Sequence, residues 1–123
     1  MAIYAIGDLH LDHSAPEKGM EIFGEQWRDH KAKIARNWQR TIHSTDIVLL
    51  PGDISWSASL PQALPDLRWL DQLPGTKVAI KGNHDHWWGP IGKTRSAAPR
   101  SIHLLQNDSL QLGDTVFFGA KLS

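Results

Sequence analysis

The chain has 123 residues, enough for one domain with a modest apolar core. Apolar residues make up 41% and charged residues 21%, and thirteen basic residues balance thirteen acidic ones, so no whole-chain charge draws the protein to nucleic acid or membranes. The absence of cysteine excludes disulfides and thiolate metal sites. The sequence has no signal-peptide pattern and no apolar run long enough to span a membrane, so we expect a cytoplasmic protein.

Strand-like and helix-like segments alternate along the first 80 residues. Three short apolar runs predict β-strands at residues 3–6, 46–51 and 76–80. A helix is predicted over Gln26–Ile42, where apolar residues recur on one face at helical spacing. A second helix is predicted over Leu60–Leu73, and Pro65 is expected to kink it or to restart it. This order, with short connections, is typical of a right-handed parallel sheet with flanking helices.

The pattern is weaker after residue 88. A short helix is predicted over Ile91–Ala97. Strand-like pieces follow at residues 101–105, 110–112 and 115–118, with a turn at Gly113-Asp114 between the last two. The sequence shows no linker or repeat, so we expect one domain.

A polar motif follows each of the first three predicted strands. The motifs are Gly7-Asp8-Leu9-His10, Gly52-Asp53 and Gly82-Asn83-His84-Asp85. Because parallel strands deliver their carboxyl-terminal loops to one edge of the sheet, these side chains are expected to converge there. Carboxylate, imidazole and amide oxygen together suit a pair of divalent transition metals. The sequence therefore predicts a metal-dependent enzyme.

Each of these residues also has an ordinary structural explanation. Asp8 and Asp53 follow glycine, where aspartate commonly caps a helix or forms a turn. His10 alone is more often a polar loop residue, and Asn83 fits a left-handed turn. The metal-site interpretation is favoured because the residues occur together, each motif behind a strand.

The three motifs resemble those of the calcineurin-like metallophosphoesterase superfamily. Asp8-Leu9-His10 matches its Asp-x-His motif, and the other two match its Gly-Asp and Gly-Asn-His-Asp/Glu motifs. The likeness extends over residues 1 to about 105 and includes Leu50-Pro51-Gly52-Asp53-Ile54-Ser55-Trp56, as in a bacterial branch of predicted phosphohydrolases. It implies an α/β fold, the first half of an α/β/β/α sandwich with a mostly parallel sheet.

The resemblance also implies a role for each motif residue. Asp8 and His10 would hold one divalent ion, Asn83 a second, and Asp53 would bridge the two. The ions would activate a water molecule to hydroxide for attack on a phosphate mono- or diester. His84 would act as the catalytic residue that faces the phosphoryl group. The metals could be Mn²⁺, Fe²⁺ or Fe³⁺, or Zn²⁺, and the substrate's identity does not follow from the sequence.

Other residues near the motifs have weaker claims. Asp85 is expected to brace its loop, and His86 to contact substrate or fill an aromatic position. Trp56, Trp87 and Trp88 lie next to motif loops, where packing in the pocket wall is favoured over stacking on substrate. The tryptophans on the predicted helices are interpreted as core residues: Trp27, Trp38 and Trp69. The basic residues Lys93, Arg95 and Arg100 are interpreted as a solvated face, with phosphate contact as the alternative.

Members of this family carry two further histidine motifs, which these 123 residues lack. We therefore expect a truncated domain over residues 1–123, with an incomplete site that binds one ion weakly and loses most two-metal catalysis. An uncovered sheet face would favour self-association. The alternative function is a non-catalytic fragment or interaction module with a residual single-metal site. Nucleic-acid binding is not supported, because no basic stripe with interleaved aromatic residues is present.

Overall fold

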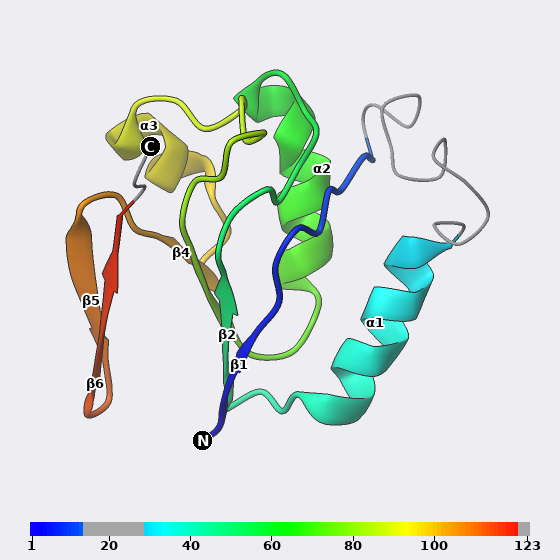
Figure 1. Ribbon diagram of the computed structural model, residues 1–123, viewed down its shortest axis with the longest axis vertical. Helices are drawn as coiled ribbons and strands as arrows, with labels where there is room; N and C mark the ends of the chain where they lie inside the picture. Colours follow the sequence, from blue (N-terminus) through cyan, green and yellow to red (C-terminus); the bar gives the residue numbers. More distant parts are fainter. Residues whose placement is uncertain (14–28, 121–123) are drawn as a thin grey trace.

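A four-stranded parallel sheet forms the centre of the molecule (Figure 1). The computed structural model describes residues 1–13 and 29–120. The strands lie in chain order: β1 (Ile3–Ala5), β2 (Ile47–Leu50), β3 (Thr76–Ala79) and β4 (Ile102–Leu104). β2 is an apolar run, and β2 and β3 are both largely buried on the two faces of the sheet, as expected for interior parallel strands. The predicted parallel α/β architecture is confirmed, and the loops after β1, β2 and β3 leave one edge of the sheet.

Three helices connect the strands: α1 (His30–Thr41), α2 (Leu60–Asp71) and α3 (Ile91–Ala97). The last has the bounds that the sequence predicted, whereas residues 26–28 of the first predicted helix, with Trp27, lie outside the described residues. α2 continues through Pro65 rather than restarting there. Proline lacks the N–H that would bond to the carbonyl of Pro61, so one intrahelical bond is lost while the helix keeps its apolar face. No helix in the described part of the chain is long and apolar enough to cross a membrane.

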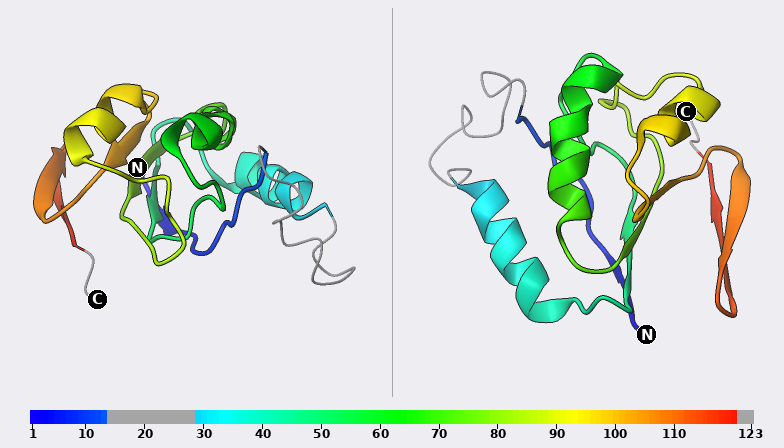
Figure 2. Two further views of the ribbon diagram at one scale, coloured as in Figure 1. Left: turned by 90° about the horizontal axis from the view of Figure 1, so that it is seen from above. Right: turned by 180° about the vertical axis from the view of Figure 1, so that it is seen from behind.

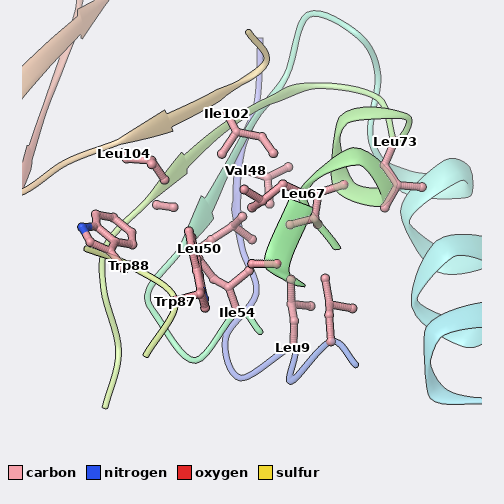
Figure 3. Close-up of a cluster of buried hydrophobic side chains, with 14 of the residues drawn as sticks. Leu9, Val48, Leu50, Ile54, Leu67, Leu73, Trp87, Trp88, Ile102 and Leu104 are labelled. Atoms are coloured by element: carbon pink, nitrogen blue, oxygen red, sulfur yellow. The ribbon is translucent and has the colours of Figure 1, made fainter. Parts of the chain in front are cut away.

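The main core lies between the sheet and the face of α2 that packs on it (Figure 3). It includes Val48 and Leu50 of β2 and Leu67 of α2, with exposed fractions of 1% or less. Trp87 and Trp88, directly after the third motif, are both 2% exposed and close one end of this core. Their burial leaves no ring face for a ligand, so packing is their role. Trp38 is also buried, and its indole N–H donates to the carbonyl of Pro74 over 2.7 Å.

A hairpin covers part of the opposite face of the sheet, as the views in Figures 1 and 2 agree. Its strands are β5 (Asp108–Leu112) and β6 (Thr115–Gly119), joined by the predicted turn at Gly113-Asp114. Leu110, Leu112 and Phe117 face a second apolar cluster on the sheet. Val116 and Phe118 point the other way and are 62% and 74% exposed.

Candidate metal centre

The loops that follow β1 and β2 run side by side beyond the strands. The backbone N–H of His10 donates to the carbonyl of Asp53 over 3.0 Å, and that of Leu11 donates to Ile54 over 2.9 Å. A parallel bridge between Leu11 and Ser55 continues the pairing. The two loops are therefore fixed against each other by the same kind of bonds that hold the sheet, and the side chains of His10 and Asp53 are brought to one place.

Backbone conformation sets Asp8, His10 and Asp53 apart from most of the chain. Their φ angles are 55°, 48° and 51°, in the left-handed region. Among the described non-glycine residues, the others with positive φ are Asp29 and Asn107. This conformation costs an ordinary residue about 1–2 kcal/mol, and such strain concentrates at functional sites. The local backbone at all three positions is therefore held by the surrounding structure rather than by its own preference.

The side chains of Asp8, His10 and Asp53 form a group that can hold a metal ion. One ligand atom from each lies within 4.8 Å of the others. Within the described part of the chain, Nδ1 of His10 is buried and has no hydrogen-bond partner. Two carboxylates and an imidazole are a suitable donor set for a divalent transition metal. The residues present thus fit the cation that the motifs predicted.

Of the two carboxylates and one imidazole in this group, Asp53 is the side chain most closely held by neighbouring residues. Its Oδ1 accepts a hydrogen bond from the backbone N–H of His84 over 2.9 Å, and its Oδ2 lies 3.2 Å from Nδ1 of the same residue. Burial alone would raise the pKa of Asp53, but the two His84 contacts and the attraction of His84 and His10 together lower it. Asp53 is therefore anionic at neutral pH, and each oxygen keeps a lone pair for another ligand.

Two glycines allow the loops after β2 and β3 to approach each other. Gly52 has a φ of 111°, and a Cβ atom there would lie 2.7 Å from the Cα of Gly82. A Cβ atom on Gly82 would lie 2.2 Å from the backbone nitrogen of Asp53. No larger residue fits at either position without moving a loop. The glycines of the second and third motifs therefore bring Asp53 and His84 together.

Asp85 is fully buried and joins the loops after β2 and β3 through hydrogen bonds. Its Oδ1 accepts hydrogen bonds from the backbone N–H groups of Ile54 and Ser55 and from the indole of Trp87, at 2.7, 3.1 and 3.0 Å. Its Oδ2 accepts one from the backbone of Gly82 over 2.8 Å. The side chain has the contacts of a loop brace, the role that the sequence predicted for it, and lies outside the Asp8–His10–Asp53 group.

Asn83 lies with Asp8 and Asp53 around an open hollow of about 250 Å³. The same hollow is lined by Lys81, a cation that sequence reasoning missed. The feature of the sequence that could have identified Lys81 is its position between β3 and the third motif. Two of the basic residues for which phosphate contact was the predicted alternative do not line this hollow. Arg95 and Arg100 line a separate cavity beside β4, and Arg95 is paired with Asp108. His86 is exposed, and within the described residues it forms no hydrogen bond or ring contact with the other candidate residues.

A second missed residue is Asp66 of α2, which is fully buried. It accepts hydrogen bonds from the backbone N–H of His13 over 3.0 Å and from the hydroxyl of Ser55 over 2.5 Å, and it also pairs with the His13 ring. These contacts tie His13 to α2. The neighbouring Asp12 is buried, and its Oδ1 lies 2.7 Å from Nζ of Lys31. The spacing of residues in the sequence does not predict these contacts, because they join different segments of the chain.

The fold and the site define an α/β protein with a candidate cation site at the carboxyl edge of a parallel sheet. The chain belongs to the calcineurin-like phosphoesterase family, whose sequence profile matches residues 1–120. This is the family that the three motifs resemble. Family membership supports a phosphoesterase-type hydrolase function that depends on metal, and the Asp–His–Asp group is compatible with it.

Known proteins similar to this chain include two from bacteriophages. The Gene 66 protein of Mycobacterium phage L5 is 36% identical over 92 residues, which are 73% of this chain and 41% of the phage protein. The Gene 66 protein of Mycobacterium phage D29 is 34% identical over 83 residues, 68% of this chain and 40% of that protein. The matched part of the chain thus spans about two fifths of the length of these curated relatives.

One solved structure shares the fold. The crystal structure of a protein of unknown function from Aquifex aeolicus superposes with a TM-score of 0.57 at 20% sequence identity. The match covers 94% of this chain and 58% of that protein. At this level of identity the likeness concerns the fold alone.

Proposed function

We propose that the site formed by Asp8, His10, Asp53 and Asn83 serves the hydrolysis of phosphate mono- or diesters with two divalent metal ions. The observation that carries the proposal is the convergence of Asp8, His10 and Asp53 within 4.8 Å beside a hollow that Asn83 lines. Asp8 and His10 would hold the first ion and Asn83 the second, and Asp53 would serve as a ligand for both. When bound, divalent ions would lower the pKa of a bound water molecule and offset charge on the phosphoryl oxygens.

The remaining side chains of the site act on the substrate. Asp53 orients His84 through Nδ1. The His84 side chain is 49% exposed, and its Nε2 is left available to the leaving oxygen. In that position the imidazole donates a proton or stabilises negative charge as the ester bond breaks. Lys81 supplies a positive charge to the hollow, where it favours an anionic phosphate group.

The test is hydrolysis of p-nitrophenyl phosphate and bis-p-nitrophenyl phosphate by the purified chain in Mn²⁺, with bound metal counted in the same samples. Asp53→Asn removes a carboxylate charge at the centre of the site and is expected to abolish activity. Asp114→Asn makes the same change in the exposed hairpin turn and is expected to leave activity unchanged. Activity that persists in Asp53→Asn would contradict the proposal.

The share of the phage relatives that is matched favours a second candidate function. About two fifths of the length of each relative aligns with this chain. On this reading the chain is a non-catalytic module that retains one weakly held ion. Inactivity with at most one Mn²⁺ per chain supports this alternative, whereas activity with about two ions per active unit supports hydrolysis.

A further inference from the structure

The indole ring of Trp56 lies against both candidate imidazoles. It stacks on the His10 ring with centroids 4.7 Å apart and planes inclined by 28°. It also meets the His84 ring at 5.1 Å with an inclination of 49°. The two imidazole rings are themselves 5.9 Å apart. Residues from three different loops therefore form one aromatic cluster, defined here as His10, Trp56 and His84.

The backbone that carries Trp56 is held firmly in place. Its N–H donates to the carbonyl of Leu11 over 2.9 Å, which extends the pairing of the first two loops. Its neighbours Ser55 and Ser57 are buried, and the hydroxyl of Ser57 donates to the carbonyl of Gln62 over 3.1 Å. The ring is thus presented from a fixed segment, which allows it to restrict the rings beside it.

The indole N–H does not explain this placement. Within the described residues, Nε1 of Trp56 is buried and has no hydrogen-bond partner. An unsatisfied buried donor is unfavourable, so contact through the ring faces must be what keeps the side chain there. A phenyl ring would preserve much of that contact without the buried N–H. The stacked face also cannot receive an aromatic group of a substrate, because His10 already covers it.

We propose that Trp56 is a positioning residue that fixes the orientations of His10 and His84. The ring limits the rotamers of the imidazole that binds metal and of the one that faces the substrate, so both are ordered before a ligand arrives. This role rests on the proposed function for its consequence in catalysis. Loss of a group that orients a metal ligand commonly weakens metal binding by about 10–100-fold.

The experiment compares Trp56→Phe and Trp56→Ala with Trp69→Ala, a matched truncation of a partly buried tryptophan that tilts against His13 at 5.8 Å. The first readout is the NMR chemical shifts of the histidine rings without metal, and the second is the Kd for Mn²⁺ by calorimetry. Trp56→Ala is expected to move the His10 and His84 ring signals and to weaken Mn²⁺ binding about tenfold. Trp56→Phe is expected to retain the wild-type Kd within about twofold, since it keeps a stacking ring. Trp69→Ala is expected to move the signals of His13 alone.

Two results would overturn the proposal. One is a Trp56→Ala protein with unchanged His10 and His84 signals, and the other is a Trp56→Phe protein that binds Mn²⁺ as weakly as Trp56→Ala. If Trp56→Ala does not fold, Trp56→Leu keeps apolar bulk without the ring and is judged by the same two readouts. A wild-type chain that binds no Mn²⁺ would count against the proposed function, whereas the metal-free ring signals would still decide the positioning role.

Discussion

Gly82 and Asp53 lie so close that a Cβ atom on the glycine would be 2.5 Å from Oδ1 of the aspartate and 2.2 Å from its backbone nitrogen. The contact joins the loop after β3 to the loop after β2 at the carboxylate that is central to the site. Both the fold and the geometry of the site therefore require a residue without a side chain at position 82.

Replacement of this glycine by alanine should damage both stability and metal binding. In Gly82→Ala the methyl group must displace one loop, and we expect the free energy of unfolding to fall by about 1–3 kcal/mol. The Kd for Mn²⁺ should rise because Asp53 moves relative to Asp8 and His10. Urea unfolding and calorimetry measure the two effects. Gly92→Ala is the matched control: a Cβ there meets nothing within 4 Å in helix α3, so stability should rise by up to about 1 kcal/mol.

Removal of the charge on Asp85 should destabilise the chain strongly. In Asp85→Asn an amide NH₂ replaces one carboxylate oxygen, although four N–H donors point at this side chain. At least one donor then faces another donor in a fully buried place, and we expect a loss of about 3 kcal/mol in the free energy of unfolding. The same change at exposed Asp114 should alter it by less than about 0.5 kcal/mol. Equal effects at the two positions in urea unfolding would refute the bracing role.

Lys77 gives the fold a distinctive dependence on alkaline pH. This residue of β3 is buried, and its ammonium donates to the carbonyl of Leu73. Burial lowers the pKa of Lys77 from 10.5 to about 8, against the attraction of Asp71, which raises it. Between these two values the unfolded chain holds a proton that the folded chain has released. Folding is therefore favoured by rising pH in this window, by up to about 3 kcal/mol.

The comparison that isolates this effect is with Lys77→Met, which has no titrating group at the position. The free energy of unfolding of the wild-type protein should rise relative to that of Lys77→Met from about pH 8 to about pH 10.5. Below about pH 8 the difference should be constant, because both states of the wild-type protein then carry the proton. Parallel stability curves over the whole range would show that Lys77 is not perturbed as the structure indicates.

The outer face of the hairpin should promote self-association. Val116 and Phe118 are exposed on β6, which within the described residues pairs with β5 alone. A second copy can meet this apolar edge strand with its own β6, and the zero net charge of the chain opposes such contact little. Phe118→Lys is expected to shift sedimentation velocity profiles toward the monomer at high concentration. Gln39→Lys adds the same charge on exposed α1 and should not. A wild-type chain that stays monomeric at all concentrations would refute the prediction.

The sequence predicted the parts of this molecule that depend on local pattern. Apolar runs located β2 and β3, and turn residues located the hairpin at Gly113-Asp114. The placement of the three motifs behind parallel strands was enough to predict that Asp8, His10 and Asp53 converge. Periodicity could not reveal the contacts of Asp66 with His13 and Ser55, because they join three segments far apart in the chain.

Two other features were hidden for different reasons. Lys77 lies in a buried strand, where its burial depends on whether the carbonyl of Leu73, just after α2, is within reach of its long side chain. The stacking of Trp56 on His10 depends on how two loops are paired, and no spacing within either loop encodes it.

The left-handed backbone at positions 8, 10 and 53 has a consequence for engineering this chain. Glycine adopts such angles without steric cost, so a screen that selects for thermal tolerance alone would tend to enrich glycine at these three positions. Each enriched variant would lose one of the donor atoms that the site brings together. A mutant library selected for stability should therefore keep these three codons unchanged, because the residues with an unfavourable backbone conformation are the ones that supply the donor atoms.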